Sequence, residues 1–298
     1  MSCDLFSLAT PGVSGLQAYR PGKSVEELQR ELGLDNIIKL ASNENPLGPS
    51  KAVLDAISST KDLSRYPDGN GFYLKKKLAE KHNVSVENIT LGNGSNDILE
   101  MAAHAFVTNK HEVIYSKHSF AVYPIVTQAV GAKHVITQAI EWGHDLDAML
   151  ASVNDSTRLM FIANPNNPTG TWVDKNNLRN LLEKIPSHVI VLVDEAYFEY
   201  AQIEEGYPNC SSWINEFHNL IVTRTFSKAY GLAALRIGYS LSHSKIADLL
   251  NRVRQPFNNN SLALVAAEVA LRDSEYIESS IKLNQSGMKQ LTQAFDNM

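Results

Sequence analysis

The sequence contains few cysteines and no long hydrophobic run. Cys3 and Cys210 are the only cysteines among its 298 residues. They form no CxxC pair, which argues against a disulfide framework and a structural zinc site. The densest apolar runs, such as residues 189–193, are far too short to cross a bilayer. The first ten residues lack the basic segment and the apolar run of a signal peptide. We therefore expect a soluble, cytoplasmic protein with no membrane partner.

A sustained cluster of positive charge is absent as well. The net charge is -5 at pH 7, and the three lysines at 75–77 lie in a helical pattern whose simplest interpretation is a solvated face. We therefore expect no nucleic-acid partner. The sequence contains no HExxH motif, and no spacing of His, Asp and Glu around Asp194 completes a metal site. No bound metal is expected.

Apolar strands alternate with helices along most of the chain. Near-continuous apolar runs at 158–164, 188–196 and 219–225 predict buried strands, and helical patterns separate such runs elsewhere in the chain. This alternation predicts an α/β fold with a mostly parallel sheet that is covered on both faces. Because the chain is longer than a single core usually serves, a smaller second part is expected beside one large domain.

Polar residues follow four of the predicted strands. "GNGSND" occupies 92–97, "NPNNPTG" occupies 164–170, Asp194 ends a third strand, and "FSK" occupies 226–228. Ligands of a parallel sheet bind outside the carboxyl ends of its strands, so these four clusters together predict a binding site. Asp194 in this position suits a helix cap, a metal ligand or a partner for a buried cation.

The segment at 92–97 has two interpretations of about equal weight when it is taken alone. It could present backbone N–H groups to an anion at a helix N-terminus, or it could be a plain turn capped by Asn or Asp. The pattern nearly matches a dinucleotide motif, but Asp97 would lie unfavourably beside a pyrophosphate, so a single phosphate fits better. Two other aspartates, Asp147 and Asp174, have the positions of helix caps.

Lys228 and Arg236 lie in "VTRTFSKAYGLAALRIGY", a stretch that otherwise has the composition of a protein interior. Burial of an ammonium group costs several kcal/mol unless the group is paired or neutralised. An arbitrary lysine is most often a surface residue in a loop. A lysine whose pKa is lowered by desolvation or positive charge can instead attack a carbonyl compound. Arg236 could supply that charge or bind a phosphate, to which Thr225 and Ser227 could also donate.

The motifs together resemble a known family. "TFSKAYGLAALRIGY" resembles the lysine segment of the fold-type I, class-II pyridoxal-phosphate-dependent aminotransferases, and "NPNNPTG" and "DEAYFEY" resemble two further motifs in the same order. "LASNENPLGPS" and "RYPDGNG" narrow the resemblance to histidinol-phosphate aminotransferases. The resemblance covers the chain from about Tyr19 to its end. It implies transamination between L-histidinol phosphate and 2-oxoglutarate, giving imidazole acetol phosphate and glutamate in histidine biosynthesis.

The resemblance also implies a domain organisation. A large pyridoxal-phosphate-binding domain with the mostly parallel sheet would span 51–257. A smaller domain would combine the N-terminal arm, 1–50, with an incomplete C-terminal part, 258–298.

The resemblance assigns roles around pyridoxal 5'-phosphate. Lys228 would bind the cofactor covalently and later transfer the proton, and Asp194 would pair with the protonated pyridine nitrogen. Tyr197 and Asn167 would form hydrogen bonds with the ring 3-oxygen, and Phe120 would stack on the ring face.

The other roles concern the phosphate, the substrate and a second subunit. The groups expected to bind the cofactor phosphate are Ser95, Asn96, Thr225, Ser227 and Arg236. Tyr66 would reach the phosphate of the neighbouring subunit, which implies a homodimer with shared sites. Tyr19 and Asn45 would close over the substrate.

The sequence departs from the family pattern at its C-terminus. Family members continue for several dozen residues that carry an arginine for the substrate, and Arg272 lies too early to match it. A fragment of a longer protein and a natural truncation are both open. The alternatives within the fold are an aromatic aminotransferase and a threonine-phosphate decarboxylase. A truncated cofactor-binding remnant with little activity is a third alternative. A nicotinamide dehydrogenase is disfavoured by Asp97 and by Lys228, which that function would leave unexplained.

Overall fold

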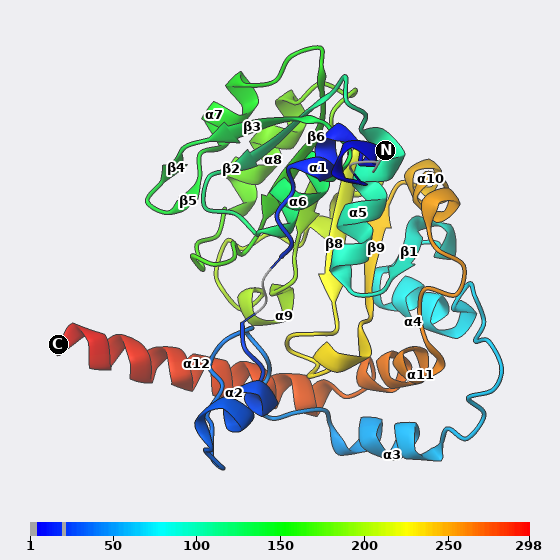
Figure 1. Cartoon of the computed structure of the whole chain (residues 1–298), viewed down its shortest axis with the longest axis vertical. Coiled ribbons are helices and arrows are strands. Elements are labelled where there is room, and N and C mark those ends of the chain that lie inside the picture. The colour runs from blue at the N-terminus through cyan, green and yellow to red at the C-terminus, as the bar shows by residue number, and fades with distance from the viewer. Residues whose placement is uncertain (1–4, 20–21) are drawn as a thin grey trace.

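A seven-stranded sheet forms the centre of the computed structural model, which describes residues 5–19 and 22–298 (Figure 1). The strand order is β1-β9-β8-β7-β6-β2-β3. Strand β9 is antiparallel to both neighbours, and the other paired strands are parallel. The predicted α/β fold with a mostly parallel sheet is therefore confirmed. The strands are β1 (Ile89–Gly92), β2 (Glu112–Ser116), β3 (Lys133–Thr137), β6 (Thr157–Ala163), β7 (Ile190–Asp194), β8 (Leu220–Thr225) and β9 (Gly238–Ser242).

Helices cover both faces of the sheet. Helices α5 (Ser95–Phe106), α6 (Val122–Ala129) and α10 (Ser244–Val253) contribute to one buried apolar cluster, which also contains Leu192 of β7. The second cluster contains Val191 and Val193. Its helices are α3 (Lys51–Ser59), α4 (Phe72–His82), α7 (Leu146–Ala151), α8 (Lys175–Lys184) and α11 (Ser261–Ala270). Successive residues of β7 thus enter opposite clusters, which explains why the strand is a continuous apolar run in the sequence.

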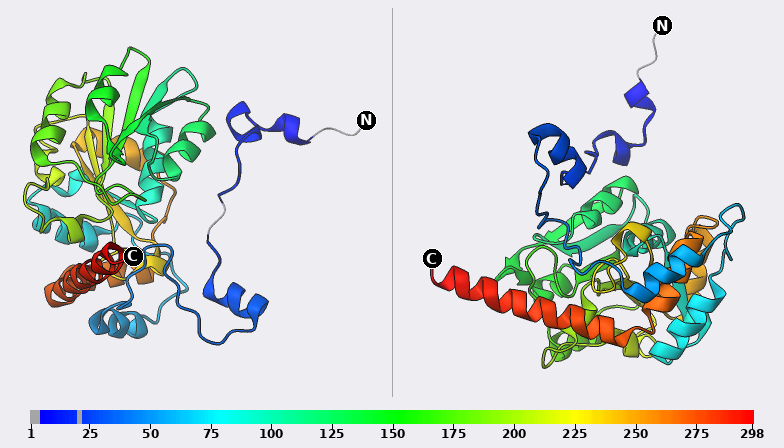
Figure 2. Two further views of the ribbon diagram at one scale, coloured as in Figure 1. Left: turned by 90° about the vertical axis from the view of Figure 1, so that its left-hand side faces the viewer. Right: turned by 90° about the horizontal axis from the view of Figure 1, so that it is seen from below.

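Several short elements connect this framework or lie outside it. The N-terminal arm contains the 3-10 helix η1 (Leu5–Leu8), α1 (Pro11–Ser14) and α2 (Val25–Leu32). Loops carry the hairpin of β4 (Ala139–Ile140) and β5 (Gly143–His144), helix α9 (Phe198–Ala201), and the 3-10 helices η2 (Val86–Asn88), η3 (Cys210–Trp213) and η4 (Ala233–Leu235). The long helix α12 (Ser274–Asp296) projects past the rest of the molecule (Figure 2). Within the described residues, no helix combines the length and apolar character that a bilayer span requires.

The predicted elements recur with small shifts at their ends. The strand predicted at 188–196 is shorter, Ile190–Asp194, and the short hairpin of β4 and β5 was not predicted. The proposed domain boundaries at 50 and 257 stay predictions. Helix α3, at the start of the large segment, packs against α11, which follows the end of that segment. Cys3 lies outside the described residues, and Cys210 is a free, buried thiol.

One of the two predicted helix caps is wrong. Asp174 caps α8 as expected, because its Oδ1 accepts hydrogen bonds from the backbone N–H groups of Asn176 and Asn177. Helix α7 is capped by Asp145, whose Oδ1 accepts from the N–H of Ala148 at 2.9 Å. Asp147 lies inside the first turn of α7, where a side chain cannot reach forward to a free N–H group.

These neighbouring aspartates provide a test of the cap assignment. We expect Asp145→Ala to lower the free energy of unfolding by about 1 kcal/mol, because a free N–H group loses its acceptor. Asp147→Ala removes the same charge two residues later in the chain. It should lower the free energy of unfolding by less than about half of the loss in Asp145→Ala. Urea denaturation followed by circular dichroism measures both values. Equal losses in the two variants would show that charge near the helix end, and not the cap, matters.

Candidate active site

The polar clusters at the strand ends line one cavity. The carboxyl ends of β1, β6, β7 and β8 lie at the same edge of the sheet, since these strands share one direction. The structure brings ten of the predicted site residues into this cavity: Ser95, Asn96, Phe120, Asn167, Asp194, Tyr197, Thr225, Ser227, Lys228 and Arg236. The predicted residues thus lie together at this edge, and their role as a binding site stays a prediction.

Asp194 is a buried carboxylate with two hydroxyl donors. It ends β7, and only 5% of its surface is exposed. Thr223 donates to its Oδ1 at 3.0 Å, and Tyr123 donates to its Oδ2 at 3.1 Å. Burial raises the pKa of Asp194, and hydrogen bonds from Thr223, Tyr123 and the N–H of Ala196 oppose that rise by favouring the ionised form.

Lys228 lies in the same cavity with its amine close to an aromatic ring. Its Nζ donates to the carbonyl oxygen of Ser42 at 3.0 Å and lies 5.6 Å from the centroid of the Tyr197 ring. The pKa of Lys228 is lowered, chiefly by burial and also by Arg236, while Glu44 and Asp194 oppose the shift. The neutral amine is therefore populated at a lower pH than that of an exposed lysine.

The cavity also contains groups whose chemistry suits an anion. Helix α5 begins here at Ser95, and its N-terminus directs backbone N–H groups toward the cavity edge. Arg236 Nη1 donates to Ser227 Oγ at 3.2 Å, which holds the guanidinium beside the hydroxyl. Gly94 has φ +80°, and a Cβ atom there would lie 2.3 Å from Arg236 Nη2. Only glycine thus allows this arginine to lie against the helix N-terminus, and the donor set matches a phosphate group.

The carboxylate of Asp97 is engaged in two hydrogen bonds beside these groups. Its Oδ2 accepts from the backbone N–H of Asn93 at 2.8 Å and from Asn258 Nδ2 at 2.7 Å. The aspartate therefore closes the turn before α5. The structure shows a turn closed by Asp97 and the start of a helix at the cavity, and binding of an anion there stays a prediction.

Three predicted site residues lie outside the cavity. Tyr66 is 81% exposed and stacks on Phe257 with ring centroids 4.5 Å apart. Tyr19 lines a neighbouring cavity, which Asn96 and Phe120 also border. Asn45 Nδ2 donates to the carbonyl oxygen of Ala229 at 2.9 Å, next to Lys228, and also contacts side chains of α12.

Two residues of the site were missed from the sequence. Thr223 lies within the predicted strand 219–225 but was given no role in the site, and no role was predicted for Tyr123. Thr223 could have been found from its position two residues before Thr225, because alternate residues of a strand face the same side. Tyr123 follows Phe120 by three residues, a spacing that places both side chains on one face of a helical turn.

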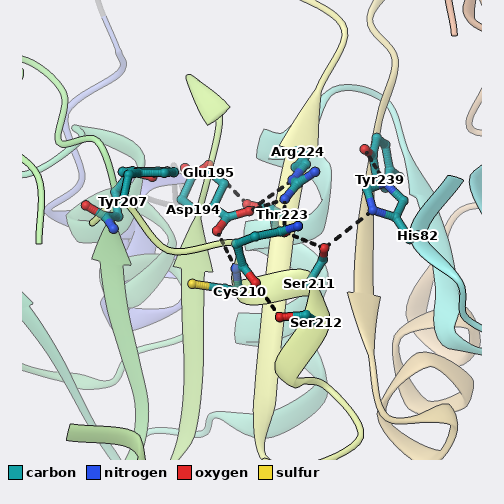
Figure 3. A network of polar contacts seen from close by, with 12 residues as sticks. His82, Asp194, Glu195, Tyr207, Cys210, Ser211, Ser212, Thr223, Arg224 and Tyr239 are labelled. Atoms are coloured by element: carbon teal, nitrogen blue, oxygen red, sulfur yellow. Dashed lines mark hydrogen bonds and ion pairs between the residues drawn. The ribbon is translucent and has the colours of Figure 1, made fainter. Parts of the chain in front are cut away.

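The opposite side of the same two strands holds a buried ion pair. Arg224 Nη2 and Glu195 Oε2 lie 2.8 Å apart, with 2% and 0% of the two side chains exposed. The guanidinium carbon lies 3.3 Å from the ring centroid of Phe198, and Glu195 Oε1 accepts from the N–H of Cys210. Burial alone would lower the pKa of Arg224, but the Glu195 carboxylate raises it above the usual value. Figure 3 shows this network, together with Asp194.

The ion pair predicts an asymmetric response to substitution. Glu195→Gln removes the carboxylate that forms the ion pair with a buried guanidinium and leaves only Glu199, which forms no ion pair with it. We therefore expect a loss of about 3 kcal/mol in the free energy of unfolding. The double variant Glu195→Gln, Arg224→Met removes both charges and should recover at least about half of that loss. Urea denaturation of both variants measures these values. A Glu195→Gln protein as stable as the unmodified chain would contradict the role given to the pair.

Comparison with known proteins places this fold and site in a class. The family described as aminotransferase class I and II matches residues 35–298. Histidinol-phosphate aminotransferase 1 of Idiomarina loihiensis is 56% identical over 287 residues, which are 96% of this chain and 78% of that protein. Histidinol-phosphate aminotransferase 2 of Pseudomonas fluorescens is 57% identical over 99% of this chain and 80% of that protein.

The fold is also similar to that of a solved structure that bears the same name as these relatives. The crystal structure of histidinol-phosphate aminotransferase from Sinorhizobium meliloti, in complex with pyridoxal-5'-phosphate, has a TM-score of 0.85 and 31% identity. The match covers 94% of this chain and 75% of that one. The chain is thus an aminotransferase of class I and II by fold and sequence. Within that class it belongs to the histidinol-phosphate aminotransferase family.

Proposed function

We propose that this protein binds pyridoxal 5'-phosphate in the cavity and transfers the amino group of L-histidinol phosphate to 2-oxoglutarate. The products would be imidazole acetol phosphate and glutamate, and the reaction would serve histidine biosynthesis. The observation that carries the proposal is the convergence of Lys228, Asp194 and an anion site in one cavity of a chain from this family. The relatives at 56% and 57% identity bear the name of this activity.

The residues of the cavity fit the proposed cofactor in their chemistry. Ser95, Asn96, Thr225, Ser227 and Arg236 offer hydroxyl, amide and guanidinium donors for the phosphate at the start of α5. When bound, pyridoxal phosphate supplies an electron sink for the carbanion that forms at the substrate Cα.

The ring of the cofactor has its own set of partners in this proposal. Phe120 offers an aromatic face, and Asp194 offers a carboxylate for the protonated ring nitrogen. Tyr197 and Asn167 would bind the ring 3-oxygen. The oxygen of Tyr197 accepts a hydrogen bond from Asn43 Nδ2 at 2.9 Å, so the phenol proton remains to be donated.

Lys228 would have two tasks that need a neutral amine. Its ε-amino group would hold the aldehyde group of the cofactor, and when free it would take the proton from the substrate Cα and return one to the product. Both tasks require the deprotonated ε-amino group. The lowered pKa of Lys228 increases the neutral fraction at a given pH, so burial and the charge of Arg236 favour both steps.

Asp194 would keep the ring nitrogen protonated. Its carboxylate can do so only while it is ionised, and burial alone disfavours that form by raising the pKa of Asp194. A protonated ring nitrogen beside it would act in the opposite direction, because a nearby positive charge favours the carboxylate. The buried position strengthens this attraction, since little water screens it.

The substrate side involves the N-terminal arm in this proposal. Tyr19 borders a cavity next to Phe120, and Asn45 binds the backbone beside Lys228. We propose that both residues close over the substrate. The cytoplasmic location and the absence of a nucleic-acid partner stay predictions.

We also propose a homodimer with shared sites. Tyr66 is exposed and does not line the cavity of its own chain, which is the placement expected of a residue that serves a second subunit. In the dimer, Tyr66 of each subunit would donate to the cofactor phosphate in the site of the other.

The reaction is tested with a panel of amino donors. The purified protein, loaded with pyridoxal phosphate, should form glutamate from 2-oxoglutarate fastest with L-histidinol phosphate, compared with L-phenylalanine, L-tyrosine and O-phospho-L-threonine. Lys228→Ala should lower this rate by at least about 10²–10⁴-fold, because both proton transfers lose their base. Faster turnover of an aromatic amino acid, or release of CO₂ from phosphothreonine, would contradict the proposed substrate. No turnover of any donor would support a remnant without activity.

The shared site is tested with a heterodimer. Tyr66→Ala should weaken cofactor binding about tenfold, as expected for loss of one hydrogen bond to a charged group. A heterodimer of Lys228→Ala and Tyr66→Ala subunits, isolated through two different tags, should keep about half of the native sites at full cofactor affinity. Tyr73→Ala, at another exposed tyrosine, is the matched control and should leave the affinity unchanged. Heterodimer affinity equal to that of the Tyr66→Ala protein would place Tyr66 in its own subunit's site.

A further inference from the structure

We propose that Tyr123 is a positioning residue, which fixes the Asp194 carboxylate for the cofactor ring nitrogen together with Thr223. The inference rests on the proposed function and assigns a role to a tyrosine that does not line the cavity. Tyr123 is completely buried in α6, and its hydroxyl donates to Asp194 Oδ2 at 3.1 Å. This bond joins residues that are 71 positions apart in the sequence.

Packing determines where the Tyr123 hydroxyl points. The ring stacks on that of Phe161 in β6, with an interplanar angle of 3° and centroids 4.5 Å apart. Its other neighbour is Phe120, whose ring meets it edge-on at 5.9 Å. Held between two aromatic rings, the tyrosine has little rotational freedom, so its hydroxyl is preorganised toward Asp194 before any ligand arrives.

Two donors from different elements define the orientation of the carboxylate. Thr223, on β8, donates to Oδ1, while Tyr123, on α6, donates to Oδ2. Donors on both oxygens restrict rotation of the carboxylate plane about the Cβ–Cγ bond, and the backbone N–H of Ala196 adds a third hydrogen bond. A carboxylate accepts about four hydrogen bonds, so Asp194 can still accept one more donor.

The same contacts link the carboxylate to the aromatic face of the cavity. Phe120 and Tyr123 lie in one turn, and the N–H of Tyr123 donates to the carbonyl oxygen of Phe120 at 3.1 Å. Phe120 lines the cavity, and Tyr123 contacts Asp194 behind it. The turn that leads into α6 thus carries both the proposed stacking residue and a donor to the carboxylate.

Tyr123 acts as a donor under all working conditions. Burial, and then the charge of Asp194, raise the pKa of Tyr123 well above its usual value, so the phenol stays protonated. A hydrogen bond to a carboxylate favours its ionised form. Loss of the hydroxyl would therefore make the charged form of Asp194 less favourable as well as less ordered.

The experiment compares two ligands that differ at one atom. Tyr123→Phe keeps the stacked ring and removes the hydroxyl. We expect it to weaken binding of pyridoxal phosphate about tenfold to a hundredfold. Binding of the 1-deaza analogue, which has a carbon in place of the ring nitrogen, should change by less than about threefold. Equilibrium dialysis against the purified protein measures both affinities without any turnover.

Matched variants separate positioning from general stability. Tyr115→Phe makes the same change at another buried tyrosine, whose hydroxyl contacts His134 Nδ1 at 2.6 Å and not Asp194, and it should affect neither ligand. Thr223→Val should reproduce the selective loss of Tyr123→Phe. In an Asp194→Asn background, Tyr123→Phe should have no further selective effect, because both act through one carboxylate.

The outcomes distinguish this inference from the proposed function. Equal weakening of both ligands in Tyr123→Phe, or a selective loss in Tyr115→Phe, would overturn the positioning role while cofactor binding stands. A Tyr123→Phe protein that binds pyridoxal phosphate as tightly as the unmodified protein would also overturn the positioning role. Failure of the unmodified protein to bind pyridoxal phosphate would overturn the proposed function, and this inference with it.

Discussion

The register between β7 and β8 is the constraint on which the site depends. Asp194 pairs with Thr223 at the carboxyl ends of the two strands. Because side chains alternate along a strand, Asp194 and Thr223 face the layer of α6, while Arg224 and Glu195 face the opposite layer. A shift of the pairing by one residue would exchange these faces. It would bury the Arg224 guanidinium beside Tyr123 and turn the donor Thr223 away from Asp194.

Buried charged side chains on both faces of the sheet favour the observed register of β7 and β8. Each buried charge at the strand ends has partners only in the observed arrangement: Thr223 and Tyr123 for Asp194, and Glu195 for Arg224. A buried ion pair adds little net stability over well-packed apolar residues, but a misplaced charge costs several kcal/mol. We interpret the Glu195–Arg224 pair accordingly, as a device that excludes wrong registers and thereby holds Asp194 in place.

The residues that belong to short motifs at the ends of strands could be predicted from the sequence. Parallel strands end at one edge, so motifs that follow separate strands were expected to converge, and Asn167, Asp194 and Lys228 do line one cavity. Tyr123 was missed because an apolar helical pattern marks it as a core residue, and its partner lies in a distant strand. The cap of α7 was wrong by two residues, since propensity does not fix the first residue of a helix. The position of Tyr66 depends on an exposed loop and, in our proposal, on a second chain, neither of which a local motif describes.

The placement of Lys228 and Arg236 in an apolar stretch has a physical reason. Arg236 adopts the left-handed conformation with φ +54°, unusual for a residue with a side chain, and its guanidinium lies where any Cβ on Gly94 would collide with it. The left-handed backbone of Arg236 and the requirement for glycine at position 94 thus both serve to place one positive charge at the start of α5. That charge also contributes to the lowered pKa of Lys228. An anion bound at α5 would offset the charge of Arg236, so it would oppose the part of the lowered Lys228 pKa that this arginine causes, while the larger contribution from burial would remain.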